Sequence, residues 1–194
     1  MDFSDVVVRR RSVRKFRDDS VPVEVIAKIL EAGRWAPSAG NSQPWRFIVI
    51  RDVGVKGRIA DACTRFSRKA WAGFSSQRAR YLAKRRGTWD KTYMKHMPVL
   101  IAVCCEVPVG IRQELALASV WMAAENMLLA ATNERLGSCV YTMYDSEEEN
   151  ALKDILQVPE QHRLATIIQL GYASNEQSSP SRKNLEEIVS HEHF

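Results

Sequence analysis

The stretch Ala36-Pro37-Ser38-Ala39-Gly40-Asn41-Ser42-Gln43-Pro44-Trp45-Arg46 separates two different hydrophobic patterns. Before it, Ile26, Ile29 and Leu30 recur at helical spacing. After it, residues 47–50 form the apolar run Phe-Ile-Val-Ile, which is typical of a strand. Two prolines and a glycine lie between these patterns and favour a loop. The stretch therefore predicts a helix, a loop and a strand in succession.

The predicted loop is rich in polar side chains. Asn41 and Gln43 carry amides that donate and accept hydrogen bonds, and Ser38 and Ser42 add hydroxyl groups. Gly40 allows another group to approach the backbone closely. Together these groups suit a flat heterocycle with donors and acceptors along one edge. An ordinary turn has a similar composition, so the loop alone leaves both interpretations open.

Length and composition predict one domain over residues 1–194, with a variable helical or lid excursion at about residues 60–95. The hydrophobic content of 45% is enough for a sizeable core. The N-terminus does not resemble a leader peptide, and no uninterrupted run of about 18 apolar residues occurs. The four cysteines and four histidines show no metal-ligand spacing. We therefore expect a cytoplasmic protein with reduced, buried thiols, no metal and no membrane partner.

The charge is unevenly distributed along the chain. The net charge is +5, and residues 56–86 hold ten basic residues against one acid, Asp61. Acidic residues gather elsewhere, at 147–149 and 186–187. This polarity indicates an anionic ligand, and nucleic acid, a phosphate-bearing cofactor and an acidic substrate all remain open at this point.

A second basic segment lies near the N-terminus, with the sequence Arg10-Arg11-Ser12-Val13-Arg14-Lys15-Phe16. Its guanidinium groups and its hydroxyl could clasp a phosphate group. Ser12 and Phe16 interrupt the positive charges, which favours the wall of a pocket over an unstructured nucleic-acid-binding arm. A solvated basic face is the remaining alternative.

Apolar patterns predict the other elements around a small sheet. Strands are expected at residues 99–105, 138–142 and 164–170. A short helix capped by Ser4 is expected to come first, and a second helix to run from Pro22 toward Pro37. A further helix is expected to begin at the capping box of residues 146–149 and to end before Pro159. These elements predict a single α+β domain.

The helix expected at residues 115–131 is apolar around nearly its whole circumference. Such a helix must be covered on several sides, which favours burial at a homodimer interface. Gly137 is expected as its C-terminal glycine. For the basic, aromatic stretch up to residue 95, we expect one or two amphipathic helices or a lid over a substrate pocket. Residues 182–189 are expected to form an arm that returns to the body.

Three segments in this order resemble the FMN-dependent nitroreductase family: residues 10–16, residues 36–45, and Leu136-Gly137-Ser138-Cys139 with the helix before it. Gly171-Tyr172 and residues 182–188 are also similar to the C-terminal region of that family. The resemblance implies a three-layer α-β-α fold with a mostly antiparallel central sheet. It also implies an intertwined homodimer with one FMN at each of two subunit-interface sites.

Carried over position by position, the resemblance assigns FMN contacts to four parts of the chain. The family's proline, serine and alanine contacts commonly come from the partner chain, and two positions depart from its pattern, at Thr142-Met143 and at Pro180. The implied cofactor-binding residues are Arg10, Arg11, Ser12, Arg14, Pro37, Ser38, Ala39, Asn41, Gln43, Thr142, Met143 and Arg182. Among these, Arg14 is the candidate for tuning the flavin potential, and no residue is expected to act as a nucleophile.

The resemblance implies an FMN-dependent enzyme that uses NADH or NADPH to reduce a nitroaromatic, a quinone or a similar small-molecule acceptor. Two-electron hydride transfer through flavin N5 would follow ping-pong kinetics. Specialised activities of the family are the first alternative: reductive dehalogenation, oxidation of a peptide azoline, or fragmentation of the flavin. A non-catalytic flavin-binding protein and a basic nucleic-acid-binding protein are the alternatives from other classes, and we expect no nucleic-acid partner.

Overall fold

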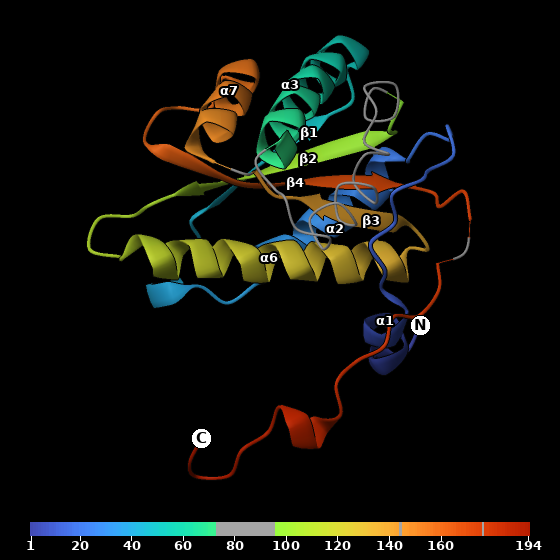
Figure 1. Ribbon diagram of the computed structural model, residues 1–194, viewed down its shortest axis with the longest axis vertical. Coiled ribbons are helices and arrows are strands. Elements are labelled where there is room, and N and C mark those ends of the chain that lie inside the picture. Colours follow the sequence, from blue (N-terminus) through green and yellow to red (C-terminus); the bar gives the residue numbers. More distant parts are fainter. Residues whose placement is uncertain (73–95, 144, 176) are drawn as a thin grey trace.

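The computed structural model describes residues 1–72, 96–143, 145–175 and 177–194. A four-stranded sheet with the order β1-β2-β4-β3 lies between two layers of helices (Figure 1). Every neighbouring pair of strands is antiparallel. The strands are β1 (Trp45–Ile50), β2 (Val99–Glu106), β3 (Gly137–Tyr141) and β4 (His162–Gly171). This arrangement confirms the α+β fold with three layers.

In the part of the chain that the structure describes, helices cover both faces of the sheet (Figure 1). The helices α3 (Val53–Ala72) and α7 (Ser146–Leu156) pack on one face, and α2 (Val23–Arg34) and α6 (Gln113–Asn133) on the other. Two hydrophobic clusters result, one on each face of the sheet. Along β2, Leu100 and Ala102 belong to the cluster under α3 and α7, whereas Ile101 and Val103 belong to the cluster under α2 and α6. Because β2 is central and buried on both faces, its sequence is a continuous apolar run.

Helix α6 is the longest helix among the described residues, with 21 residues. By length and composition it could span a membrane, but in this fold its inner side packs on the sheet and on α2, as in the core helix of a globular domain. Its buried side includes Val120 and Met127. On the other side Leu115, Trp121 and Met122 remain 38–45% exposed. The helix is therefore only partly covered by its own chain.

Three helix ends differ from the sequence prediction. The helix α1 (Phe3–Arg9) is capped by Asp2, whose carboxylate accepts a hydrogen bond from the Ser4 amide at 2.9 Å. Helix α7 is capped by Asp145, not by Ser146. Helix α6 ends at Asn133 with Glu134 as its C-cap; Arg135, with a φ of 62°, takes the left-handed position that follows, and Gly137 is the first residue of β3.

The predicted excursion and the C-terminal arm are seen in part. Helix α3 covers the first part of the excursion, and residues 73–95 lie outside the described residues. Lys56 of α3 is buried and donates to the Met97 carbonyl at 2.6 Å, so not every basic residue of this stretch lies on a solvated face. Residues 178–194, with the short helix η2 (Leu185–Glu187), are exposed and extend away from the body (Figure 1). The expectation that the arm returns to the body is therefore wrong for this chain.

The cysteines lie inside the protein. Cys63, Cys104, Cys105 and Cys139 are buried free thiols. Burial raises the pKa of Cys104 to about 11, so this thiol is protonated at neutral pH. Among the described residues no group of three or more histidine, cysteine or acidic side chains is placed to hold a metal ion.

Candidate functional site

The loop that follows α2 has an unusual backbone. Gly40, Asn41 and Gln43 all have positive φ values, at 58°, 52° and 47°. Within the loop the backbone N–H of Gln43 donates to Ser38 Oγ at 3.0 Å. The short helix η1 (Ala39–Asn41) is bonded to α6 because the backbone N–H of Ala39 donates to Ser119 Oγ at 3.1 Å. Asn and Gly tolerate this left-handed region better than most residues. The loop is therefore held in one shape while the Asn41 and Gln43 side chains stay exposed.

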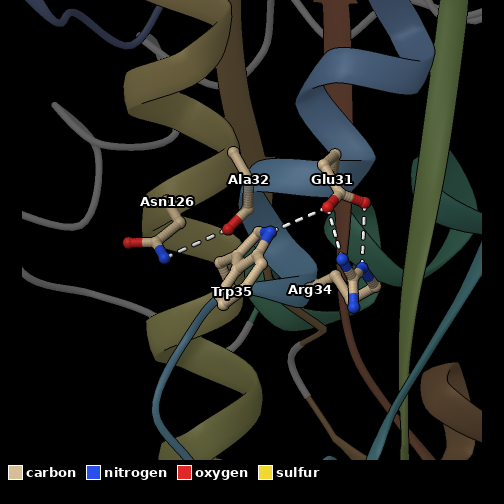
Figure 2. Close-up of polar contacts among 5 residues, drawn as sticks. All are labelled: Glu31, Ala32, Arg34, Trp35 and Asn126. Carbon is tan, nitrogen blue, oxygen red and sulfur yellow. Dashed lines mark hydrogen bonds and ion pairs between the residues drawn. The ribbon is translucent and has the colours of Figure 1, made fainter.

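Polar contacts fix the end of α2 from which this loop starts, as Figure 2 shows. The Glu31 carboxylate accepts from Arg34 Nε at 2.9 Å and from Trp35 Nε1 at 2.7 Å. Asn126 of α6 donates to the Ala32 carbonyl at 3.1 Å. The hydrogen bonds from Arg34 and Trp35 lower the pKa of Glu31 to about 2. These contacts set the direction in which the chain enters the loop.

The arginine-rich N-terminal segment lies along the end of the sheet. Ser12 forms a parallel bridge with Ser138 of β3, and the Val13 amide donates to the Ser138 carbonyl at 2.9 Å. Arg10 Nε lies 3.1 Å from the Glu125 carboxylate of α6. The guanidinium of Arg14 is half-buried and donates to the Ser12 carbonyl at 3.3 Å. The segment is thus part of the folded body, which supports the prediction of a pocket wall.

The Arg11 side chain contacts different parts of the chain from those of Arg10 and Arg14. Arg11 Nη1 donates to the Arg10 carbonyl at 2.7 Å, and Nη2 contacts Ser179 Oγ. Arg11 also lines a cavity of about 460 Å³ together with Arg9 and Arg135, and neither Arg10, Ser12 nor Arg14 lines this cavity. Arg9 and Arg135 are not among the site residues that the sequence predicts. The only available signal was their positive charge, which many surface residues share.

The loop and the arginine segment both contact α6, but at different positions along its axis. The loop contacts Ser119, whereas Arg10 pairs with Glu125, six residues further along the helix. Six residues of α-helix correspond to about 9 Å along the axis. Across the described parts of the chain, no hydrogen bond or ion pair joins residues 10–14 to residues 37–43. One chain alone therefore does not bring the two predicted groups into direct contact.

The remaining predicted site residues lie at the end of β3 and in the C-terminal arm. The end of β3 is fixed because Thr166 Oγ1 donates to the Tyr141 carbonyl at 2.8 Å. Just beyond it, Thr142 is exposed and Met143 packs in part against the cluster under α3 and α7. Arg182 is exposed on the arm and donates to the neighbouring Ser181 carbonyl at 3.1 Å. Their contacts to a cofactor stay predictions.

Several buried polar atoms near these elements lack a hydrogen-bond partner within the described part of the chain. They include Arg11 Nε, the Ser42 hydroxyl in the loop and the Ser138 hydroxyl beside Ser12. Buried polar groups are normally paired, so unpaired ones point to a missing partner such as a ligand or water. These three atoms lie in segments that the sequence singled out, whereas the other unpaired atoms, of His162 and Gln169, belong to β4.

Fold and site together define a class: a three-layer α+β protein that sets a basic segment and an amide-bearing loop along its central helix. Residues 7–172 of the chain match the nitroreductase family. The chain belongs to this family.

Similar proteins include dehalogenating members of the family. The chain is 32% identical over 168 residues to the iodotyrosine deiodinase of Thermotoga neapolitana, covering 87% of each sequence. The crystal structure of oxidized iodotyrosine deiodinase bound to FMN and 3-iodo-L-tyrosine superposes with a TM-score of 0.88 at 29% identity, over 100% of both chains. A BluB-like flavoprotein from Clostridium difficile 630 superposes with a TM-score of 0.80 at 27% identity, over 98% of this chain and 99% of that one.

Proposed function

We propose that this chain is an FMN-dependent oxidoreductase that works as a homodimer and reductively removes halogen from a halogenated phenol of the iodotyrosine type. The observation that carries this proposal is the end-to-end similarity to the deiodinase that holds FMN and 3-iodo-L-tyrosine, with a TM-score of 0.88. The similarity to the BluB-like flavoprotein is weaker, at 0.80. It supports the fold and the flavin more than a particular substrate.

The residues of the N-terminal segment fit a phosphate-bearing flavin. Arg10, Ser12 and Arg14, which we call the clasp, offer two guanidinium groups and a hydroxyl. The hydroxyl of the adjacent Ser138 is buried without a partner in the described structure. Guanidinium groups bind phosphate oxygens through charge-assisted hydrogen bonds. Among the described residues, the carboxylate paired with this group is that of Glu125, which is itself 48% exposed. The segment therefore keeps a net positive charge where the phosphate would bind.

Other residues would orient the flavin ring. Arg14 would stabilise negative charge near N1 and the C2 carbonyl, and the Met143 amide would donate toward N5. The exposed amides of Asn41 and Gln43 would contact the ring edge. Pro37, Ser38 and Ala39 would contact the flavin from the partner chain. Thr142 would lie near N5, Arg11 beside the clasp and Arg182 near the phosphate. When bound, FMN supplies two electrons, which with one proton replace the carbon–halogen bond by a carbon–hydrogen bond and release halide.

The homodimer would complete this site. Leu115, Trp121 and Met122 leave apolar surface on the outer side of α6, and Phe3 of α1, a helix that contacts α6, is 73% exposed. Exposed apolar surface of this kind is typical of an interaction site. A second copy that covers it would bring its own loop toward the clasp of the first chain. This arrangement would remove the separation seen within one chain.

Membership of the nitroreductase family supports a second candidate activity. In it, NADH or NADPH would reduce the bound flavin, which would then reduce a nitroaromatic or a quinone. Donor and acceptor would use the same face of the flavin in turn. The pocket would then select acceptors by size and charge.

One set of assays separates these activities. The purified protein is loaded with FMN, and iodide and tyrosine are measured after incubation of 3-iodo-L-tyrosine with dithionite as reductant. In parallel, NADH and NADPH oxidation is followed with a nitroaromatic or a quinone as acceptor. Stoichiometric iodide and tyrosine support the dehalogenase. Nicotinamide consumption without iodide release would favour the second candidate, and a protein that takes up no FMN would contradict both.

The clasp is tested by Arg14→Ala, with Arg17→Ala as a matched control. Loss of one charge-assisted contact to phosphate or ring costs about 1.5–3 kcal/mol, which corresponds to roughly 10- to 150-fold weaker FMN binding. Arg17 directly follows the segment but is exposed and pairs with Asp19 at 3.0 Å, so its removal should leave FMN affinity unchanged. Fluorescence titration of FMN measures both. Equal affinity in the two variants would place the clasp elsewhere.

A further inference from the structure

Trp35, at the C-terminal end of α2, exposes most of its side chain. It is 73% exposed, whereas Trp45 is 6% and Trp121 is 38% exposed. It is the C-cap residue of α2 and comes two residues before Pro37 of the loop. Tryptophan is enriched among the residues that dominate the binding energy of protein interfaces. The indole is therefore a candidate anchor for another molecule.

Contacts within α2 hold the indole in one orientation, as Figure 2 shows. Its Nε1–H donates to the Glu31 carboxylate at 2.7 Å, and the Arg34 guanidinium lies 5.1 Å from the ring centroid. Because the N–H is already paired, covering the ring leaves no unpaired donor. A side chain that is ordered before binding also loses less conformational entropy on association. Glu31 and Arg34 carry opposite charges and bond to each other, so together they add no net charge beside the ring.

Trp35 lies level with exposed apolar surface on α6. The end of α2 is bonded to Asn126, and the loop is bonded to Ser119, seven residues earlier on α6. Trp35 lies between these two contacts along the chain, and Met122 lies between them along α6. Met122 is one turn before Asn126 on the same side of the helix and is 41% exposed. The indole and Met122 therefore belong to one apolar surface.

The loop that follows Trp35 indicates what covers this surface. Under the proposed function, on which this inference rests, residues 37–39 contact the flavin bound to the partner chain. Two residues of extended chain span at most about 7 Å, so Trp35 must then lie close to the same partner chain. A second copy of this chain is thus the molecule that can cover the ring. Because the charges beside the ring cancel, two identical surfaces can approach without repulsion there.

We propose that Trp35 is an anchor of the homodimer. Its ring packs against the partner chain, and this contact holds the loop at the flavin site of that chain. Trp35 acts through the association of the two chains and does not contact the flavin.

The test measures the dimer dissociation constant in saturating FMN, by dilution of fluorescently labelled protein. Trp35→Ala should raise this constant about 30-fold or more, the loss typical of an anchor residue. Trp35→Phe keeps an apolar ring and should raise it less. The matched control is Val53→Ala, because Val53 is 53% exposed at the start of α3, on the opposite face of the sheet. Its dissociation constant should equal that of the wild type.

FMN binding gives a second readout. Trp35→Ala should bind FMN weakly at low protein concentration and regain the wild-type affinity once the concentration is high enough to restore the dimer. A direct contact between Trp35 and the flavin would instead weaken FMN binding at every protein concentration. That result would overturn the proposal.

The remaining outcomes separate this inference from the proposed function. An unchanged dimer dissociation constant in Trp35→Ala overturns the inference and leaves the proposed function intact. The same loss in Val53→Ala as in Trp35→Ala also overturns it, because the effect would then not belong to this surface. A wild-type chain that binds FMN as a monomer would contradict the homodimer of the proposed function, and this inference with it.

Discussion

The contact between Gly137 and Val13 predicts that Gly137→Ala will loosen the N-terminal segment. A Cβ at residue 137 would lie 2.7 Å from both Cβ and Cγ1 of Val13, which is 5% exposed. Val13 cannot move away freely, because its amide donates to the Ser138 carbonyl at 2.9 Å. Overpacking of this kind costs about 1–3 kcal/mol. In a domain of this length, each kcal/mol lowers Tm by about 2–4 °C.

The loss of stability in Gly137→Ala should be accompanied by weaker FMN binding. Arg10, Ser12 and Arg14 flank Val13, so displacement of the segment should also weaken FMN binding. The matched control is Gly57→Ala in α3, where an added Cβ meets no atom within 4 Å. This control should raise stability by about 0.5–1 kcal/mol, as alanine does inside a helix. Thermal unfolding with and without FMN measures both variants. A Gly137→Ala protein with wild-type Tm and FMN affinity would refute the reasoning.

Two further predictions concern hydrogen bonds to the carboxylates of Glu31 and Glu148. Glu31→Gln should lower Tm at pH 7; because the folded pKa of Glu31 is about 2, below the ordinary 4.5, the difference from wild type should shrink as the pH falls from 4.5 toward 2. An equal difference at pH 7 and pH 2.5 would show that the contacts with Arg34 and Trp35 are not responsible. Tyr141→Phe removes a hydroxyl that donates to the fully buried Glu148 carboxylate, and should cost about 1–3 kcal/mol. An unchanged urea midpoint at constant m-value would contradict this.

The sheet could be predicted because its signal is local. Residues 99–105 are apolar without interruption, and β2 (Val99–Glu106) is buried on both faces. Helix starts were less certain, because neighbouring residues can both act as caps. Asp145 and Ser146 are both common N-cap residues, and Asp145 is the cap because its backbone is extended and its carboxylate accepts from the Glu148 amide.

The division of the arginine segment could not be predicted from sequence. Arg10 and Arg11 are chemically identical, and only the bridge between Ser12 and Ser138 determines which side each one faces. Gly137 misled the prediction for a similar reason. Glycine there suggested a helix end, but the strand needs it to admit Val13, and Arg135 takes the left-handed position instead. Both outcomes depend on contacts between segments more than a hundred residues apart in the chain.

Helix α6 links the proposed flavin site to the proposed dimer. It holds the loop through Ser119 and the clasp through Glu125, about 9 Å apart along its axis, and it exposes apolar residues on its outer side. A ligand that binds the clasp of one chain and the loop of another is bound only when two chains are together. Flavin binding and dimerisation would then stabilise each other by mass action. The apolar outer side of α6, unfavourable in an isolated chain, follows directly from such coupling.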